Sequence, residues 1–376
     1  MLTDMEDKQE SNMYDVVVFG ATSFVGTLVA RYVANHAPQG VSFALAGRNE
    51  QKLQSLGIDA PLIVADASDA EDMRRLAESA RVVITTVGPY DLYGRTLVRA
   101  CAEAGTDYLD LAGEVNFVRD SILTLDETAR KSGARIVHSA GFDSIPSDIA
   151  LFRLHQKQGS LGTTRMVVED LVGGISGGTV ASALNAREHV AQLDEEKRAA
   201  LRSPFALAPG ARSTKKVRST GATGDLAPFF MAGYNTRLVQ RSAQLLDYGP
   251  EFAYSEYRRV GSRWRSLITT ARLKVFGWLT STHLGRRLAS RFLPAPGEGP
   301  SAEERARGRF KIKTTDQESV RVELDMDPGY EGTALMIAES AFSLLEHEGD
   351  AGVTTPAAAL GDTLVERLRA AGMRIS

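Results

Sequence analysis

The sequence holds a single cysteine, Cys101, among 376 residues. One cysteine cannot form an intrachain disulfide, which fits a protein of a reducing compartment. The six histidines show none of the spacings that bind zinc, so we expect no metal site. The Gly-x-Ser-x-Gly turn of the α/β-hydrolases is also missing. These absences argue against a disulfide-stabilised fold, zinc chemistry and a serine hydrolase.

Long apolar runs and a large excess of one charge are missing too. No stretch of 18 consecutive apolar residues occurs, so a membrane-spanning helix is not expected. A net charge of −3 argues against a nucleic-acid binder. Residues 1–12 are polar and acidic, and we interpret them as a flexible leader. A secretory signal would need a basic start followed by an apolar run, and this segment has neither. We therefore expect a cytoplasmic protein.

What the sequence does contain is a regular alternation of short apolar runs and helical patterns from Tyr14 onward. This alternation is typical of an α/β fold, with a Rossmann-like parallel sheet and helices on both faces. A chain of 376 residues also exceeds the size at which one core keeps growing, which favours two domains. The expected strands are Tyr14–Phe19, Val41–Ala46, Leu62–Ala65, Val82–Thr86, Tyr108–Leu111 and Arg135–His138, and the expected helices are Phe24–Ala34, Gln51–Leu56, Glu71–Ser79, Gly94–Ala104 and Phe117–Lys131.

The rhythm changes near Asp148, where a second region begins. Residues 203–225 are rich in Ser, Pro, Gly and basic residues, and we expect an extended, mobile loop there. The helix expected from Ala334 carries an apolar stripe, which needs a partner and should pack against the parallel sheet. The other elements expected in this region are the strands Met166–Leu171, Arg309–Thr314 and Ser319–Met326 and the helices Val180–Gln192, Ala334–Glu346 and Pro356–Ala371.

A glycine-containing turn follows the first strand directly. In the segment Gly20–Gly26, Gly20 permits a tight turn and Gly26 lets the next helix pack closely on the strand, while the helix N-terminus offers amides to a pyrophosphate. Ser23 replaces the middle glycine of the usual dinucleotide fingerprint and is small enough to keep the backbone near the phosphates. The cofactor-binding residues predicted in this turn are Gly20, Thr22, Ser23, Phe24, Val25 and Gly26.

The end of the second strand indicates which dinucleotide binds. A carboxylate there would favour NAD, whereas this strand ends in Gly47-Arg48, with Lys52 one turn further on. Arg48 can pair with a 2′-phosphate, so we expect NADP(H); a solvated arginine that opens a helix is the alternative. Asp66 closes the third strand and either meets the adenine edge or caps the next helix.

Three unusual turns follow strands four to six, at the edge where parallel sheets bind ligands. They are Val87–Tyr90, Asp110–Glu114 and Gly141–Asp148. Helix capping and packing offer a second account of each turn. We interpret Val87, Gly88 and Pro89 as contacts of the nicotinamide end, and Glu114, Asp143 and Ser144 as residues of the substrate cleft.

Candidate proton donors lie near the same edge. Tyr90 and Tyr93 carry hydroxyls that could protonate the carbanion left by hydride addition; the alternative for Tyr90 is a packing role as an amphipathic lid. His138 closes a strand and is interpreted as a core or cofactor-facing residue. A second glycine-rich turn, Gly173–Gly178, is either a plain connection or a part of the cleft that offers amides to a carbonyl oxygen. The cleft residues predicted there are Ser176, Gly177, Gly178 and Thr179.

Residues 255–292 form the most basic part of the chain, with nine lysines and arginines against one acid, Glu256. Both tryptophans, Trp264 and Trp278, lie in this segment among apolar residues. Such a segment suits an anionic membrane surface or an acidic carrier domain, so we expect contact with a carrier or peripheral contact with the inner membrane face. The alternative is a helix that buries its apolar side as a lid of the second domain, with its arginines solvated.

In this order the motifs resemble those of the saccharopine dehydrogenase-like oxidoreductases. Within that superfamily the chain is most similar to the trans-acting enoyl reductases of phthiocerol-type lipid synthesis, which act on an acyl chain carried by a polyketide synthase. The resemblance implies an NADP-binding Rossmann domain over 13–150, an inserted α+β substrate domain over 151–333, and C-terminal helices over 334–376 that return to the Rossmann domain. It spans nearly the whole chain and includes Gly20–Gly26, Gly47-Arg48, Val87–Tyr90, Cys101–Asp110, Gly113-Glu114, Gly141–Asp148, Ser176–Thr179, Asp327–Tyr330 and Thr355–Ala357.

The expected function follows from the resemblance and the cofactor site together. We expect hydride transfer from NADPH to the β-carbon of an enoyl thioester, with protonation of the α-carbon. Reduction of an imine on an amino-acid adduct is a second hypothesis, and a carboxylate-binding arginine pair would favour it. A lipid-surface protein that holds NADP without turnover is a third. An oligomer is compatible with all three.

Overall fold

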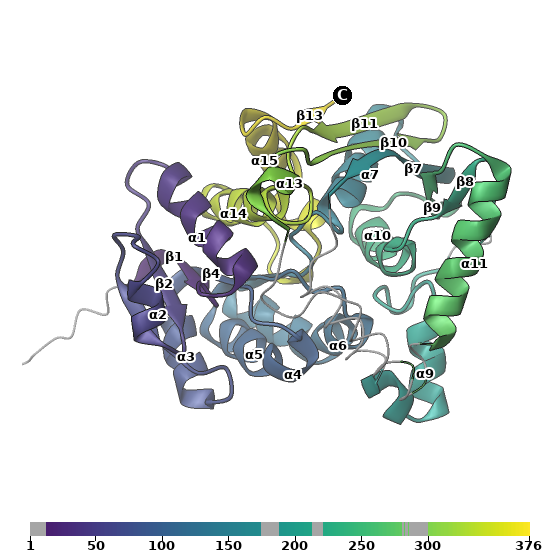
Figure 1. Ribbon diagram of the computed structural model, residues 1–376. Helices are drawn as coiled ribbons and strands as arrows, with labels where there is room; N and C mark the ends of the chain where they lie inside the picture. The colour runs from purple at the N-terminus through teal and green to yellow at the C-terminus, as the bar shows by residue number, and fades with distance from the viewer. Residues whose placement is uncertain (1–12, 174–187, 213–220, 280–281, 283–284, 286–299) are drawn as a thin grey trace, which may run out of the picture.

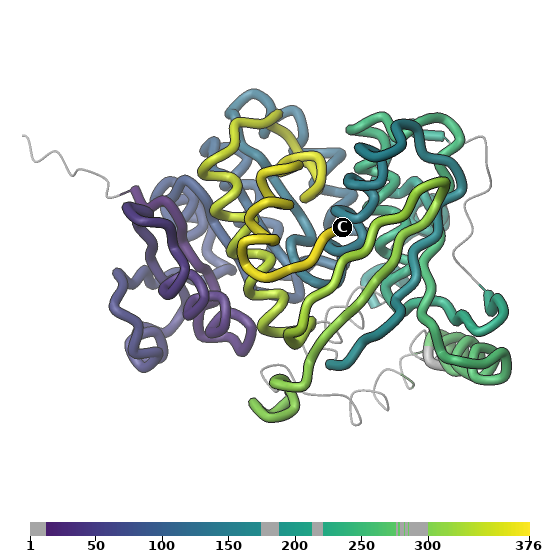
Figure 2. The backbone as a smooth tube through the Cα atoms, turned by 90° about the horizontal axis from the view of Figure 1, so that it is seen from above, coloured from purple at the N-terminus to yellow at the C-terminus, as the bar shows by residue number. Residues whose placement is uncertain are grey.

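The computed structural model describes residues 13–173, 188–212, 221–279, 282, 285 and 300–376. Two β-sheets organise this part of the chain (Figure 1). Seen from above, the C-terminal helices lie between the two sheets (Figure 2). The architecture is thus α/β, with a parallel sheet and a second, mixed sheet.

The first sheet contains seven strands, all parallel, in the order β12-β6-β5-β4-β1-β2-β3. Its central strands are runs of buried apolar residues, as expected for a sheet covered on both faces. β1 lies between β2 and β4, where the strand order reverses and α/β sheets bind dinucleotides. The strands are β1 (Tyr14–Phe19), β2 (Phe43–Gly47), β3 (Leu62–Val64), β4 (Ala80–Thr85), β5 (Asp107–Leu109), β6 (Arg135–Val137) and β12 (Gly352–Thr354).

Helices cover both faces of this sheet. On one face α1 (Phe24–His36) packs against α14 (Glu331–Glu346), which also contacts β4 and β5. On the other face α3 packs against α5, and α5 against α6 (Figure 1). The remaining helices of this region are α2 (Glu50–Gln54), α3 (Ala70–Glu78), α4 (Tyr90–Tyr93), α5 (Arg95–Ala104), α6 (Val115–Ser132) and α15 (Pro356–Ala370).

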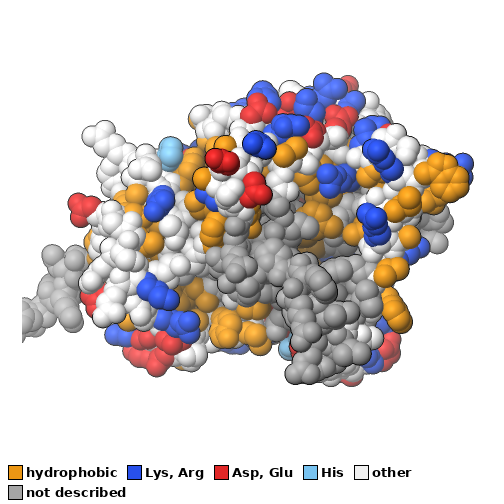
Figure 3. Space-filling model, in the orientation of Figure 1, with side chains coloured by type: hydrophobic (Ala, Val, Ile, Leu, Met, Phe, Trp, Pro, Cys, Tyr) orange, Lys and Arg blue, Asp and Glu red, His pale blue; other side chains and the backbone are white. Residues whose placement is uncertain are grey.

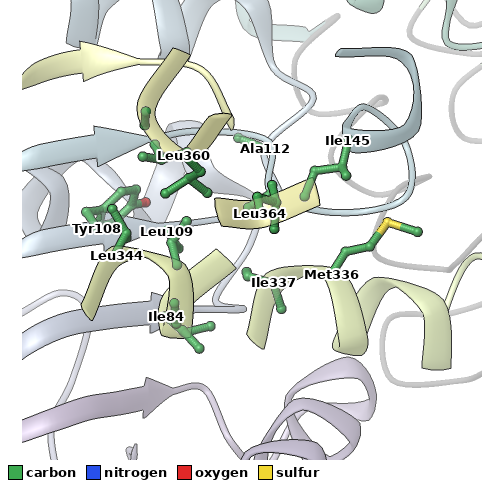
Figure 4. Packing of buried hydrophobic residues seen from close by; sticks show 14 of the residues in the cluster. Ile84, Tyr108, Leu109, Ala112, Ile145, Met336, Ile337, Leu344, Leu360 and Leu364 are labelled. Atoms are coloured by element: carbon green, nitrogen blue, oxygen red, sulfur yellow. The ribbon is translucent and has the colours of Figure 1, made fainter. Parts of the chain in front are cut away.

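The helix α14 is buried along most of its length, from Gly332 to Leu344. Met336 and Ile337 of α14 and Leu364 of α15 belong to the cluster that also holds Ile84 and Leu109 of the sheet (Figure 4). Each such side chain contributes about 1.5–3 kcal/mol by its burial. The tail helix therefore packs against the first sheet, and its apolar surface extends well beyond a single stripe.

The second sheet contains six strands in the order β13-β11-β10-β7-β9-β8. β7 and β9 run parallel, whereas the other neighbours are antiparallel. The helix α7 packs on β10 and β11 and also on α15, so it connects the two sheets. The elements are β7 (Thr163–Val172), β8 (Leu226–Pro228), β9 (Ala253–Arg259), β10 (Arg309–Thr315), β11 (Ser319–Leu324), β13 (Arg374–Ile375), α7 (Ile145–Gln158), α9 (Glu195–Arg202), α10 (Ala232–Leu246), α11 (Arg263–Leu279) and α13 (Ala302–Arg305).

The predicted strands of the first sheet are confirmed, with ends that differ by at most two residues. The sequence patterns missed β12, because only Val353 of its three residues is strongly apolar. The interpretation of residues 203–225 as an extended loop is wrong at its start, since Ala206, Leu207 and Ala208 are buried. Most of the helix expected over 180–192 lies outside the described residues.

Candidate active site

The turn after β1 brings two glycines into close contact with their neighbours. Gly20 has a φ of 83°, and a Cβ on it would lie 2.7 Å from Cγ2 of Val87. A Cβ on Gly26 would lie 2.0 Å from the carbonyl oxygen of Gly20. No side chain can occupy either space, so α1 begins directly against the end of β1.

Ser23 is the N-cap of α1, and its side chain accepts a hydrogen bond from only one of the helix's first amides. Its Oγ accepts a hydrogen bond from the Gly26 amide (2.9 Å) and lies 3.0 Å from Oγ1 of Thr86, at the end of β4. Within the described residues, no acceptor is found for the amides of Phe24 and Val25. Two open amides at the N-terminus of a helix of this length favour an anionic ligand.

The loop Asp327–Tyr330 lies beside this turn. The Phe24 ring meets the Tyr330 ring edge-on, with centroids 5.0 Å apart, and the Arg305 guanidinium lies 5.5 Å from the Phe24 ring centroid. Arg305 also pairs with Glu331 at 2.6 Å. The C-terminal part of the chain therefore packs against one side of the turn Gly20–Gly26. No local sequence pattern around Gly20 could have indicated this contact.

The end of β2 presents a cation to solvent. Arg48 follows β2 directly and is exposed, as is Lys52 on α2. Hydrogen bonds from the Ser68 amide and hydroxyl, together with the charge of Arg48, lower the pKa of Asp66. Asp66 thus stabilises the turn that precedes α3, while Asp69 is the residue that caps that helix.

The loop after β4 is attached to the loop after β5 by a buried carboxylate. Oε1 of Glu114 accepts from the Tyr90 amide (2.8 Å), and Oε2 accepts from the Asp91 amide (2.9 Å). This fixes the segment Val87–Pro89, whose Val87 touches the Gly20 turn. Glu114 was predicted as a cleft residue, but its buried carboxylate is used to hold these two loops together.

The hydroxyl of Tyr90 is also used internally. It donates to the Thr85 carbonyl (3.2 Å) and accepts from the Leu111 amide (3.2 Å). Burial and the nearby Asp110 carboxylate raise the pKa of Tyr90 well above its ordinary value. This placement favours the packing role for Tyr90 over proton donation. Tyr93, at the end of α4, is 45% exposed and stays a candidate donor.

A second buried carboxylate joins the ends of β5 and β6. Oδ1 of Asp110 accepts from the amides of Ala112 and Ser139, each at 2.9 Å, and Oδ2 lies 2.7 Å from Nδ1 of His138. Ser139 has a φ of 65°, and its hydroxyl meets the Tyr234 hydroxyl of α10. His138 is fully buried and belongs to the core, as expected.

A polar network that the sequence did not reveal lies behind Asp143 and Ser144. Nδ2 of Asn235 donates to the Asp143 carbonyl (2.8 Å) and to Oε1 of Glu256 (3.0 Å), and its Oδ1 accepts from the Ser144 hydroxyl (2.9 Å). Ser144 precedes α7 but makes no side-chain cap. Glu256 is fully buried on β9, and burial raises its pKa to about 8. The only signal in the sequence was a lone acid in a basic segment.

The structure thus brings together the Gly20 turn and the loops that carry Val87, Glu114 and Ser144. Arg48, Lys52 and Asp66 lie beyond the ends of the neighbouring strands β2 and β3. The predicted cleft residues Ser176, Gly177, Gly178 and Thr179 lie outside the described residues.

The chain is similar in sequence to proteins of a known family. The model of the saccharopine dehydrogenase NADP-binding domain matches residues 16–137. A Mycobacterium tuberculosis protein named as a trans-acting enoyl reductase is 40% identical over 408 aligned positions, which cover 96% of this chain and 97% of that protein. The trans-acting enoyl reductase of Mycobacterium bovis is 37% identical and covers 96% of each chain. The chain belongs to the family of these trans-acting enoyl reductases.

The chain is accordingly an NADP-binding oxidoreductase of the trans-acting enoyl reductase type, and the resemblance seen in its motifs is confirmed. Among solved structures, saccharopine dehydrogenase (L-Glu forming) from Saccharomyces cerevisiae has a TM-score of 0.52 at 14% identity, covering 96% of this chain and 99% of that one. At this identity the likeness shows a common fold and nothing about the substrate.

Proposed function

We propose that the chain reduces the carbon–carbon double bond of an enoyl thioester with NADPH. The observation that carries this proposal is the full-length similarity to proteins named as trans-acting enoyl reductases. The open amides of Phe24 and Val25, beside glycines that admit no side chain, support dinucleotide binding at the same sheet edge. NADPH, when bound, supplies the hydride equivalent.

The chain's own residues bind and orient the cofactor in this proposal. The amides of Phe24 and Val25 bind the pyrophosphate, with Thr22 and Ser23 beside them. Arg48 and Lys52 bind the 2′-phosphate, because both are cations that the structure leaves exposed. Asp66 lies near the adenine edge, and Val87, Gly88 and Pro89 line the nicotinamide end.

The substrate in this proposal is an acyl thioester carried on an acyl carrier domain. The loop that carries Asp143 and Ser144 is proposed to line the substrate cleft. Residues Ser176–Thr179 are also predicted to line it. Arg237, which is half-buried, and the buried Arg241 of α10 both donate to backbone carbonyls, so they do not form the carboxylate-binding pair that an imine reductase of amino acids would need. Residues 255–292 are proposed to contact the carrier or the inner membrane face.

The reaction is tested by NADPH oxidation with purified protein over enoyl thioesters and amino-acid imines. We expect turnover of the thioesters, with the saturated thioester as product and one NADPH consumed for each. Turnover restricted to imines, or no turnover with either class in a protein that binds NADPH, would refute the proposal.

The proton donor is tested by a matched pair of tyrosine variants. Tyr93→Phe should lower kcat roughly a hundredfold, the contribution of a positioned general acid, with little change in KM. Tyr90→Phe should keep kcat and lose about 1 kcal/mol of stability, because its hydroxyl serves the backbone. An unchanged kcat in Tyr93→Phe would remove this residue from the mechanism.

A further inference from the structure

The helix α11 (Arg263–Leu279) turns its polar side toward the protein. Ser266 and Thr270 are buried, and α11 packs on β8 (Leu226–Pro228). The Ser266 hydroxyl donates to the Leu226 carbonyl (2.5 Å), and the Thr270 hydroxyl donates to the Ser266 carbonyl (2.8 Å). A surface helix of a globular protein normally buries its apolar side, so this orientation is the reverse of the usual one.

Five large apolar side chains of α11 point away from the protein, whereas Leu273 is partly buried on the same side of the helix as Ser266 and Thr270. Trp264 is 78% exposed and Trp278 70%, and the exposed fractions of Leu267, Ile268 and Val275 lie between 45% and 55%. At 100° per residue these positions form one stripe, roughly 100° wide, along the helix. The stripe runs along the outer edge of the molecule, where hydrophobic side chains gather in Figure 3. Its members are Trp264, Leu267, Ile268, Val275 and Trp278.

Cations border the apolar stripe on both sides. Arg263 and Lys274 lie on one side and Arg265 and Arg272 on the other, each roughly 90° from the centre of the stripe. All four are exposed, and the sequence of α11 contains no acidic residue. The alternative in which this helix buries its apolar side as a lid is therefore wrong for the described side chains.

We propose that α11 lies in the surface of an anionic lipid bilayer, with its stripe among the acyl chains and its cations at the phosphates. Three features favour lipid over a protein partner. Tryptophan prefers the interface between water and hydrocarbon, and two tryptophans stand roughly 21 Å apart at the two ends of the stripe. The four cations lie at the level that lipid phosphates would occupy. The stripe is convex, and lipid conforms to a protruding helix without a matching groove.

This proposal names the partner of the basic segment raised under the proposed function, and it does not depend on the reaction. Among the described helices none has the length and apolar character needed to cross a membrane, so the contact would be peripheral. It would place the protein where long acyl chains partition. Loss of enoyl turnover would leave it standing, and loss of lipid binding would leave the reaction standing.

The two tryptophans of α11 are the only ones in the chain, so selectively excited tryptophan fluorescence reports on this helix alone. The full-length protein is titrated with phosphatidylcholine vesicles and with vesicles that also contain roughly 30% phosphatidylglycerol. We expect a blue shift and protection from a water-soluble quencher with the anionic vesicles. Partitioning should be at least tenfold weaker on neutral vesicles and should fall as salt is raised to about 0.5 M.

A variant without the four cations of α11 tests whether vesicle binding depends on this surface or only on the net charge of the protein. Arg263→Ser, Arg265→Ser, Arg272→Ser and Lys274→Ser together keep both tryptophans and should weaken partitioning at least a hundredfold, at roughly fivefold per cation. The matched control replaces four exposed cations elsewhere and changes net charge equally; it should bind vesicles within roughly threefold of wild type. NADPH affinity verifies that both variants are folded. The control positions are Arg31, Arg99, Lys131 and Arg321.

The same measurement can assign the stripe to another occupant. No blue shift with anionic vesicles overturns the proposal, and so does an equal loss in the two charge variants. A shift caused by an acidic acyl carrier protein, but not by vesicles, would assign α11 to a protein partner. A shift that grows with protein concentration in the absence of lipid would assign it to a second copy of the chain.

Discussion

Two neighbouring stretches along the edge of the first sheet differ in whether their polar groups have hydrogen-bond partners within the protein. After β1 and β2, the amides of Phe24 and Val25 have no acceptor among the described residues, and Arg48 faces solvent. After β4, β5 and β6, Asp110 and Glu114 accept hydrogen bonds from four backbone amides. The first stretch is open to a ligand, whereas the second is closed upon itself.

The difference separates binding groups from supporting groups. A buried carboxylate that accepts several amides fixes the loops that carry it, because each such bond is lost if the loops part. An amide left open at a helix N-terminus costs free energy until an anion or water meets it. Charged residues at one sheet edge can thus have opposite roles, and their hydrogen-bond partners, not their residue type, distinguish them.

The largest expected effect comes from opening the closed stretch. Asp110→Ala leaves the amides of Ala112 and Ser139 without their acceptor and separates His138 from its partner. We expect a loss of about 3–5 kcal/mol of unfolding free energy, as for a buried pair that loses one member. Urea denaturation measures the loss, while NADPH affinity of the folded fraction should stay close to wild type.

An exposed aspartate, Asp59, provides the control for this variant. Asp59→Ala should change stability by no more than about 0.5 kcal/mol, the usual range for surface substitutions. Should Asp110→Ala instead keep its stability and lose NADPH binding, the carboxylate would serve the ligand, and the stretch after β4, β5 and β6 would not be closed.

The open stretch is tested at Arg48. Arg48→Gln should weaken NADPH binding by about 1.5–3 kcal/mol, the value of a hydrogen bond to a charged group, and should hardly change NADH binding. Calorimetry with both cofactors measures the two affinities. Arg31→Gln, at an exposed position of α1, should change neither. Equal losses for NADPH and NADH, or a native preference for NADH, would show that Arg48 does not read the 2′-phosphate.

The open stretch was also the part that sequence could predict. Gly20, Gly26 and Arg48 follow strands made of continuous apolar residues, and both the strand pattern and the glycine spacing are local. The roles of Glu114 and Tyr90 could not be predicted in the same way. Each is used by backbone groups of another loop, and no local pattern states which loops a fold brings together.

The orientation of α11 shows the same limit. Its apolar and basic residues were evident from the sequence, but a helical pattern defines faces without stating which one the protein covers. Ser266 and Thr270 are buried on the inner side, where the Ser266 hydroxyl donates to the Leu226 carbonyl of β8 and the Thr270 hydroxyl donates to the Ser266 carbonyl of the helix itself. Likewise, Glu256 stood out as a lone acid, but its partner Asn235 lies on α10, which no pattern had indicated.

The smallest expected effect concerns Glu256, which extends the closed stretch into the second sheet. Burial raises the pKa of this carboxyl from 4.5 to about 8, so the folded protein binds a proton that the unfolded chain releases. Its contribution to stability is complete below pH 4.5 and declines as pH rises toward 8, by at most about 1.4 kcal/mol per pH unit. Between pH 6.5 and 7.5 the expected loss is about 1 kcal/mol.

Glu256→Gln should remove this decline without disturbing the network. The amide oxygen can accept from Asn235, and the amide nitrogen can donate to the Tyr254 hydroxyl, which lies 3.2 Å from Oε2 in the native chain. Other titrating groups, such as the buried Asp148, act equally on both proteins and cancel in the difference. Urea denaturation across this range should show the variant gaining on wild type as pH rises. Parallel curves would mean that Glu256 is ionised throughout, and the closed stretch would then hold a buried charge whose neutralising partner has yet to be found.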